Sequence, residues 1–315
     1  MSEGDSLSRV RGASTVEVQA QAKINLRLRI LARETSGYHQ LETLFLRIDL
    51  ADTVRIRRTS GERSLDVVGD VDPALIGPVE QNLAWRAAEA YFASKEMRGG
   101  FAIEVTKRIP IGGGLGGGSA DAGAVLRALD AMDDEAMEPV VLLSLAARLG
   151  ADVPFLATEH AYALAWGRGE RMLALAPPPA RDALLVVPAF SVNTAEAFGW
   201  LAPPDVMAVR RRYVESFALL PGQLSDWTSL RELAGNDFEG AVEHHHPEVR
   251  DHLDLLRAQG CSLYQMSGSG STLFGIWTST PEAPRSDALT PDPRAEAKYI
   301  RTRTAARVER VSAIE

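Results

Sequence analysis

The sequence predicts an α+β protein of two domains, and three observations support this prediction. Expected strands and helices mix without the strict alternation that a parallel α/β sheet requires. The chain has 315 residues, enough for two domains or for one large domain. A segment at 176–181 with three prolines separates a first run of elements from a second, so we place the domain boundary there.

The first domain is expected at residues 14–177, after a disordered arm at 1–13. Alternating and helical spacing of apolar residues predicts its elements. In order these are one or two strands at 15–33, strands at 44–48 and 52–57, a helix at 82–92, a strand at 101–105, a helix at 122–132, a helix at 140–149 that Gly150 ends in a left-handed conformation, a turn at 151–154, and a hairpin of 161–165 with 171–175.

The second domain is expected at residues 178–304, followed by a tail at 305–315. It begins with a buried strand at 183–187. The later elements are helices at 194–201, 206–219, 237–244 and 248–258, strands at 263–266 and 272–276 around a second glycine turn at 267–271, a poorly ordered segment at 278–294, and an edge strand at 298–304.

The glycine-rich stretch Pro110–Asp121, which reads PIGGGLGGGSAD, carries the clearest chemical signal. Glycine costs backbone entropy wherever it is ordered, but it allows close approach and positive φ. The stretch follows a strand and precedes a helix, for which Ser119 is the expected N-cap and Asp121 an acid of the first turn. A loop of bare N–H groups that ends at a helix N-terminus is typical of a phosphate site.

Three anion-binding loops share this order of elements. The P-loop needs a lysine that the stretch lacks. The dinucleotide fingerprint fits Gly112, Gly114 and Gly117, but its acid would have to come from a helical, polar run, so it stays as an alternative. The third pattern, Pro-x-x-x-Gly-Leu-Gly-x-x-Ser-Ala, is that of the galactokinase–homoserine kinase–mevalonate kinase (GHMP) superfamily, and the residues in register with it are Pro110, Gly114, Leu115, Gly116, Ser119 and Ala120.

Within this superfamily the chain resembles the 4-diphosphocytidyl-2-C-methyl-D-erythritol kinases. Seven separated motifs carry the resemblance, in the family's order, over roughly residues 16–276. They are Ala22–Leu26, Gly37–His39 with Leu44–Phe45, Gln81–Leu83, Gly112–Asp121, Gly150–Pro154, Asn236–Phe238 and Gly268–Ser271.

The resemblance implies a two-domain GHMP-kinase-like fold, with an N-terminal ribosomal-S5-like ATP-binding domain and a C-terminal ferredoxin-like α/β-sandwich domain. It also implies transfer of the γ-phosphoryl group of ATP, with Mg²⁺, to the 2-hydroxyl of 4-diphosphocytidyl-2-C-methyl-D-erythritol in the non-mevalonate isoprenoid pathway. A sister kinase that acts on homoserine or a mevalonate is the closest alternative. A nucleotide-binding oxidoreductase and an RNA-binding module are the alternatives outside the kinases.

By motif position the resemblance implies that Lys23 and Asp152 are catalytic, with Asp152 as base and Lys23 as its electrostatic partner. The implied ATP-binding residues are Asn82, Lys107, Pro110, Gly112, Gly113, Gly114, Leu115, Gly116, Gly117, Gly118 and Ser119, and Ser119 is also a magnesium ligand. The implied substrate-binding residues are Asn25, Tyr38, His39, Thr194, Phe198, Gly268 and Ser269. The family often carries Asn where this chain has Asp121, so the role of Asp121 is open.

The composition limits which binding partners and which cellular compartment we expect for this protein. The net charge is −8 with no basic block, which disfavours nucleic acid as a partner and leaves small molecules. The single cysteine excludes an internal disulfide framework and fits a reducing compartment. No apolar run approaches the ~18 residues of a membrane span. We therefore expect a cytoplasmic protein without a membrane partner, a monomer or a weak dimer.

Overall fold

The computed structural model describes residues 10–35, 39–69, 71–201, 219–279 and 296–314. Four expectations lie wholly or mainly outside these residues. They concern the arm at 1–13, the substrate residue Tyr38, the helix at 206–219 and the poorly ordered segment at 278–294.

A long antiparallel hairpin of β1 (Thr15–Arg33) and β2 (His39–Thr59) is the centre of the first sheet. The prediction of separate strands at 44–48 and 52–57 was wrong, because both belong to β2. The register passes from Gln21 paired with Ala51 to Lys23 paired with Arg47, so the residues between them form a bulge and the chain does not turn.

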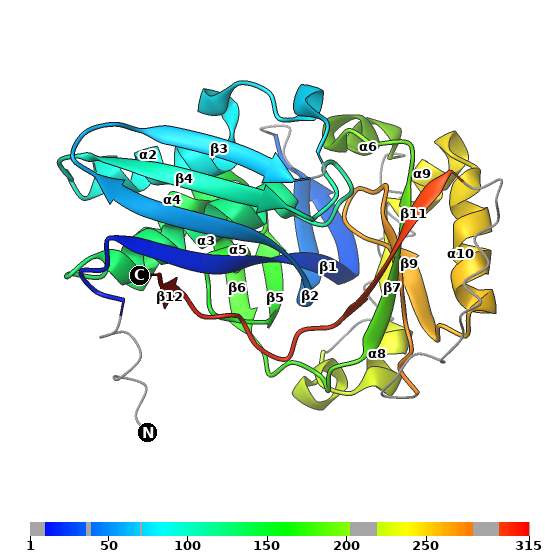
Figure 1. The fold of residues 1–315 in the computed structure, drawn as a ribbon. Coiled ribbons are helices and arrows are strands. Elements are labelled where there is room, and N and C mark those ends of the chain that lie inside the picture. The colour runs from blue at the N-terminus through cyan, green and yellow to red at the C-terminus, as the bar shows by residue number, and fades with distance from the viewer. Residues whose placement is uncertain (1–9, 36–38, 70, 202–218, 280–295, 315) are drawn as a thin grey trace.

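The other strands extend this sheet on both sides of the hairpin (Figure 1). Its main order is β12 (Ser312–Ala313), β1, β2, β4 (Gly100–Lys107), β3 (Ser64–Gly69). The predicted hairpin of β5 (Tyr162–Gly167) and β6 (Arg171–Ala174) is confirmed and pairs with β2. The short strand β8 (Gly235–Asn236) pairs in parallel with β1. The sequence pattern predicted neither β3 nor β12.

Four helices cover one face of this sheet, and two 3₁₀ turns precede them (Figure 1). They are α2 (Leu83–Ser94), α3 (Gly117–Met132), α4 (Pro139–Leu149) and α5 (Val153–Leu156), after η1 (Pro73–Leu75) and η2 (Val79–Gln81). Asn82 caps α2, since its side chain accepts a hydrogen bond from the Ala84 amide at 2.9 Å.

Two predicted helix ends were wrong. Ser119 does not cap α3. The helix begins at Gly117, because Gly116 adopts a left-handed φ of 71° and lets the chain enter the helix three residues earlier than expected. Asp121 consequently lies beyond the first turn. Gly150 is extended, with φ 170°, and is not a left-handed helix stop.

The second sheet is antiparallel, with the order β11 (Ala297–Arg303), β7 (Asp182–Pro188), β10 (Leu273–Ile276), β9 (Leu263–Met266). Helix α10 (Glu248–Ala258) packs on β9 and β10, and β11 lies at an edge, as predicted. The remaining elements are α6 (Thr194–Trp200), η3 (Pro221–Leu224), α8 (Trp227–Leu233) and α9 (Glu239–His245). The predicted α+β class is confirmed.

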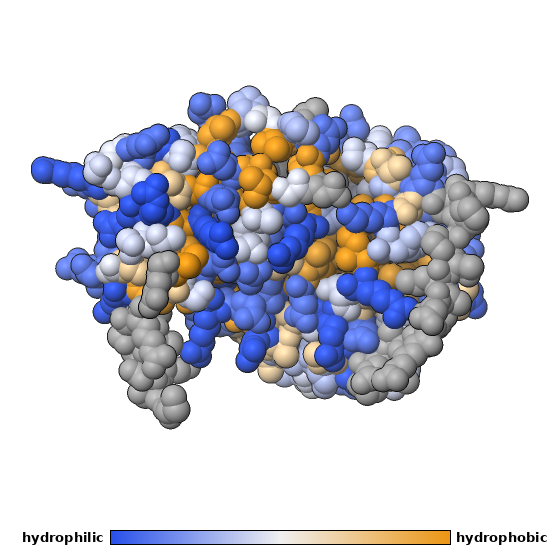
Figure 2. Space-filling view, in the orientation of Figure 1, coloured by the Kyte–Doolittle hydropathy of each residue, from blue (hydrophilic) through white to orange (hydrophobic). Residues whose placement is uncertain are grey.

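The two sheets contact each other through β2 and β11, and one of the two apolar clusters among the described residues extends across both sheets. Leu185, Phe274 and Ile276 of the second sheet belong to the same buried cluster as Ile24 and Leu26 of β1. Hydrophilic side chains cover most of the face shown in Figure 2, and hydrophobic ones show between them over its middle. Among the described helices, none is both long enough and apolar enough to cross a membrane.

Candidate functional site

A cleft of about 2120 Å³ lies where the two sheets meet. It brings together every predicted site residue that the structure describes, from both halves of the chain. Tyr38 lies outside the described residues. The lining includes Lys23, Asn25, His39, Asn82, Lys107, Pro110, Gly112–Ser119, Asp152, Thr194, Phe198, Gly268 and Ser269.

The first glycine loop packs directly against the second glycine turn. Gly114 has φ 75°, and a Cβ there would lie 2.2 Å from the Ser267 carbonyl oxygen, so this position needs glycine for conformation and for space. The Thr272 amide donates to the Gly113 carbonyl at 3.2 Å. The two loops, about 150 residues apart in sequence, therefore form one wall of the cleft.

The loop ends at the N-terminus of α3, whose first amides have no partner inside the helix. Ser119 lies in this first turn and lines the cleft. Unpaired amides together with the positive end of the helix dipole favour an anion at this point. The local geometry is therefore suited to phosphate oxygens.

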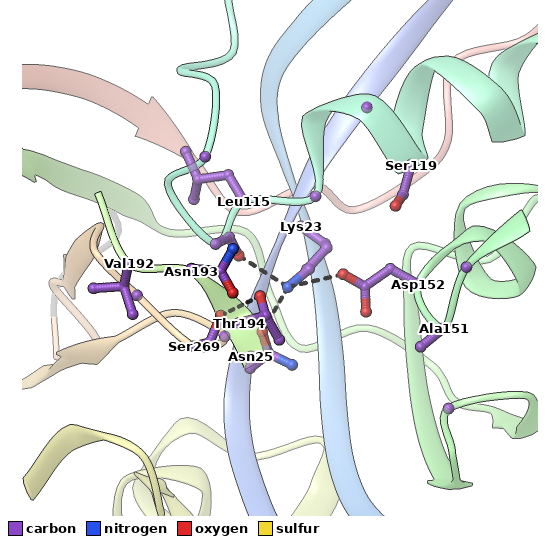
Figure 3. Close-up of a pocket in the computed structure, with 18 of the residues that line it drawn as sticks. Lys23, Asn25, Leu115, Ser119, Ala151, Asp152, Val192, Asn193, Thr194 and Ser269 are labelled. Atoms are coloured by element: carbon purple, nitrogen blue, oxygen red, sulfur yellow. Dashed lines mark hydrogen bonds and ion pairs between the residues drawn. The ribbon is translucent and has the colours of Figure 1, made fainter. Parts of the chain in front are cut away.

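Lys23 lies at the centre of the cleft, with its ammonium between three elements (Figure 3). Nζ donates to Asn25 Oδ1 at 2.8 Å and to the Gly114 carbonyl at 2.9 Å, and it lies 3.3 Å from Asp152 Oδ2. The Lys23 side chain is 3% exposed, whereas that of Asp152 is 30% exposed. Buried contacts therefore fix the Lys23 ammonium, while the Asp152 carboxylate stays open to a hydroxyl group in the cleft.

Bulges in β1 explain how a lysine in a strand reaches this position. The register of β1 with β2 shifts between Gln21 and Lys23 and again between Asn25 and Arg27. Bulges redirect side chains and are common next to active sites. They leave Lys23 and Asn25 buried on the cleft side of the strand.

Two residues that sequence reasoning missed orient Asn25. Its Nδ2 donates to Thr43 Oγ1 at 2.8 Å, and Gln265 Nε2 donates to the Asn25 carbonyl at 2.7 Å. These bonds leave Asn25 Oδ1 directed at Lys23. No local signal distinguishes Thr43 or Gln265 in the sequence, because they lie 18 and 240 residues from Asn25.

Lys107 is held by two buried carboxylates. Its Nζ donates to Asp52 Oδ2 and, at 2.7 Å, to Asp121 Oδ2, and Asp52 Oδ1 accepts from the Ile109 amide at 2.8 Å. Burial alone lowers the pKa of Lys107, but the two carboxylates outweigh it and raise that pKa. Burial, and to a lesser extent Asp52, raises the pKa of Asp121 to about 7 although Lys107 opposes the shift.

This group was only partly predictable. Lys107 was expected at the nucleotide, and the structure adds that its ammonium donates to the buried carboxylates Asp52 and Asp121. Asp52 was not expected, and its only sequence signal is an acid inside an apolar alternation. A Cβ on Gly117 would lie 3.4 Å from Lys107 Nζ, so the ammonium stays directly beneath the glycine loop.

The far end of the cleft contains aromatic rings and a second polar contact. His39 stacks on Phe198 with ring centroids 4.4 Å apart, and Phe198 meets Phe238 edge-on at 4.9 Å. Burial, and next the Arg33 charge, lower the pKa of His39, which favours the neutral ring. Thr194 Oγ1 and Ser269 Oγ lie 2.8 Å apart (Figure 3), which joins α6 to the second glycine turn.

Family comparisons agree with this geometry. The family model described as GHMP kinases N terminal domain matches residues 82–160, and that described as GHMP kinases C terminal matches residues 216–286. The 4-diphosphocytidyl-2-C-methyl-D-erythritol kinase of Desulfotalea psychrophila is 36% identical over 267 residues, covering 84% of this chain and 86% of the relative. That of Pelotomaculum thermopropionicum is 38% identical over 264 residues, covering 82% and 87%.

Solved structures give the same result. A crystal structure of 4-(cytidine 5'-diphospho)-2C-methyl-D-erythritol kinase superposes with a TM-score of 0.70 at 32% identity, covering 92% of this chain and 99% of the other. The homoserine kinase of Cytophaga hutchinsonii superposes with a TM-score of 0.69 at 18% identity, covering 96% and 98%, and so shares the fold. The predicted two-domain GHMP-type fold is confirmed. The chain belongs to the 4-diphosphocytidyl-2-C-methyl-D-erythritol kinase family of GHMP kinases.

Proposed function

We propose that this protein transfers the γ-phosphoryl group of ATP to the 2-hydroxyl of 4-diphosphocytidyl-2-C-methyl-D-erythritol, which yields the 2-phosphate and ADP. One observation carries the proposal. The Lys23 ammonium contacts both the Gly114 carbonyl of the glycine loop, at 2.9 Å, and the Asp152 carboxylate, at 3.3 Å. The glycine loop, suited to phosphate, and Asp152, whose carboxylate can accept a proton, thus lie on either side of the Lys23 ammonium.

In the proposed step the substrate oxygen attacks the γ-phosphorus, and the bond from that phosphorus to the β,γ-bridging oxygen breaks. Asp152 accepts the hydroxyl proton as the new bond forms. Lys23 stabilises the carboxylate and the charge of the transferring group. Loop amides and the α3 N-terminus hold the other phosphate oxygens, so the protein mainly positions the reactants.

We assign the two ends of the cleft to the two ligands. The nucleotide lies along the glycine loop near Asn82 and Lys107. The cytidyl group lies at the His39–Phe198 stack, where flat apolar rings offer a surface for a base. The Thr194–Ser269 contact and Gly268 lie between these ends and are suited to the substrate diphosphate.

Magnesium fits the oxygen donors beside the glycine loop. Mg²⁺ takes few protein oxygens and keeps phosphate oxygens as ligands, so we propose that nucleotide phosphates bind most of the ion. Asp121 Oδ1 is buried and has no hydrogen-bond partner among the described residues. We assign Ser119 and Asp121 as the residues that would hold the ion, which supplies positive charge to the triphosphate when bound.

Substrate specificity tests the reaction. A coupled assay of ADP release should give turnover with the cytidyl substrate and none with homoserine or mevalonate. Turnover with homoserine alone would replace the proposed substrate but leave the kinase assignment in place. The proposal also places the enzyme in the cytoplasm, where the buried Cys261 would stay reduced.

Asp152→Asn tests the base. The substitution keeps the size of the side chain and removes the proton acceptor, so turnover should fall by about 10²–10⁴-fold while ATP binding, measured by calorimetry, is retained. Glu159→Gln is the matched control, because it removes an exposed carboxylate seven residues away that does not line the cleft. Normal turnover of Asp152→Asn with intact ATP binding would disprove the assignment.

A further inference from the structure

Arg47, a residue of β2, is an arginine buried in the protein interior. It is 1% exposed, and among the described residues no acid forms an ion pair with it. Burial, and next the charge of Arg127, lower the pKa of Arg47. Burying a guanidinium is costly unless its donors are used, so this residue needs a structural or functional reason.

The Arg47 guanidinium collects four backbone carbonyls from one short segment. Nη2 donates to the carbonyls of Phe155, Leu156 and Thr158 at 3.1, 3.0 and 3.0 Å, and Nε donates to that of His160 at 3.1 Å. These carbonyls include those of Phe155 and Leu156, the last two residues of the one-turn helix α5. The Phe155 carbonyl also accepts the Thr158 amide at 3.1 Å, so Arg47 adds to the hydrogen bonds that fix the end of this helix.

The Arg47 side chain also belongs to a series of stacked groups that extends to Lys23. The guanidinium lies over the Phe155 ring at 5.1 Å, and Phe155 stacks on Phe45 at 5.0 Å. The Lys23 ammonium lies 5.7 Å from the centre of the Phe45 ring. Arg47 therefore supports both the segment after Asp152 and the apolar surface beneath Lys23.

Asp152 is the residue from which α5 begins. Its carbonyl accepts the Leu156 amide at 3.2 Å, while its side chain makes no capping bond and points to Lys23. The backbone of α5 is therefore what sets the position of this carboxylate. Helix α3 also approaches this segment closely, since a Cβ on Gly123 would lie 2.4 Å from the Leu156 carbonyl that accepts from Arg47.

We propose that Arg47 is a positioning residue for the phosphoryl transfer, which it promotes by holding α5 so that Asp152 faces Lys23. The inference rests on the proposed role of Asp152. Arg47 does not line the cleft and touches no ligand there. Because a displacement of about 1 Å at a reacting group can cost about 100-fold in rate, four backbone hydrogen bonds to this turn are enough to matter.

Arg47→Met is the first test. It keeps the apolar volume and removes both donor nitrogens and their four hydrogen bonds, so kcat should fall about 10- to 100-fold while KM for ATP stays unchanged. Arg47→Lys retains a positive charge with N–H donors and should recover part of the loss. Arg127→Met is the matched control, since Arg127 is also a buried arginine but its only described hydrogen bond, at 3.5 Å, goes to the Gln19 carbonyl. It should lower stability and leave kcat near the wild-type value.

Chemical rescue separates positioning from simple loss of packing. Guanidinium ion should raise the turnover of Arg47→Ala, and urea at the same low concentration should not, because urea has the same shape but no charge and fewer donors. Equal loss of kcat in Arg47→Met and Arg127→Met, or equal effects of guanidinium and urea, would overturn the proposal.

A double-mutant cycle distinguishes failure of this inference from failure of the proposed base. If Arg47 acts through Asp152, the single-turnover rate of Asp152→Asn should not fall further when Arg47→Met is added. Full turnover of Asp152→Asn would remove the base assignment itself. A slow Asp152→Asn together with an Arg47→Met of wild-type rate would refute only the role of Arg47.

Discussion

Gly123→Ala tests how closely α3 must approach the turn that carries Asp152. Gly123 is buried in the interior of α3, where alanine is ordinarily favoured over glycine by about 0.8–1.0 kcal/mol. Here a Cβ would lie 2.4 Å from both the carbon and the oxygen of the Leu156 carbonyl, about 1 Å short of the 3.4 Å at which ordinary contact begins. The obstacle is backbone, so a change of rotamer cannot relieve it.

The expected result is a loss of stability. Overpacking a close-packed site costs about 1–3 kcal/mol. The upper part of that range applies because Arg47 donates to the same Leu156 carbonyl at 3.0 Å and restrains it. After the gain in helix propensity, the free energy of unfolding should fall by about 1–2 kcal/mol, which corresponds to roughly 2–4 °C in Tm per kcal/mol for a chain of this size.

Gly118→Ala is the control for stability, since it is the same substitution in the same helix. A Cβ at Gly118 would meet only Leu83 Cδ1, at 3.8 Å, so this variant should be as stable as the wild type or slightly more stable. Thermal unfolding and urea unfolding of both variants, without ligands, measure the difference. A Gly123→Ala variant as stable as Gly118→Ala would refute the reasoning.

Three further predictions concern the loop, the buried acid and the thiol. Gly114→Ala should abolish measurable ATP binding in calorimetry, because φ is 75° and the Cβ would lie 2.2 Å from the Ser267 carbonyl oxygen. Gly112→Ala has the same φ, but its Cβ would make only an ordinary contact with Ser191 Cβ at 3.9 Å, so its effect should be milder. Burial raises the pKa of Asp121 to about 7 from 3.8, so the folded state holds a proton that the unfolded state loses between these values. Stability should therefore fall as pH rises through that window, by up to about 1.4 kcal/mol per pH unit. Urea unfolding at several pH values should show this fall in the wild type and not in Asp121→Asn. Burial raises the pKa of Cys261 to about 12, so a disulfide reagent near pH 8 should label this single cysteine only after unfolding. Rapid labelling of the folded protein would contradict its burial.

Local patterns predicted the elements that have strong periodicity. The expected helix at 82–92 is α2 (Leu83–Ser94), and the hairpin of β5 and β6 lies where its glycine turn indicated. Pattern reasoning failed where periodicity is weak or the decisive atoms are backbone. The half-exposed β3 and the two-residue β12 carry little apolar alternation, and the start of α3 depends on the left-handed conformation of Gly116.

The functional site divides in the same way. Motifs in single short segments identified Lys23, Asp152 and the glycine loop, because each motif reflects a local requirement for charge, turn or close approach. The partners of these residues were not predictable. Asp52 contacts Lys107 across 55 residues and Arg47 contacts the α5 carbonyls across 108 or more. No single segment reports such pairings.

The amino-acid sequence by itself determined the strands and helices with clear apolar periodicity, a loop suited to phosphate, and a lysine and an aspartate in recognisable motifs. Only the tertiary structure decided that the Lys23 ammonium lies between the Gly114 carbonyl, 91 residues away, and Asp152. It also decided that buried Arg47 and Gly123 hold the turn from which Asp152 projects. The reason is physical: periodicity and turn chemistry act between near neighbours in the chain, whereas burial and hydrogen bonding act between whatever the fold brings together.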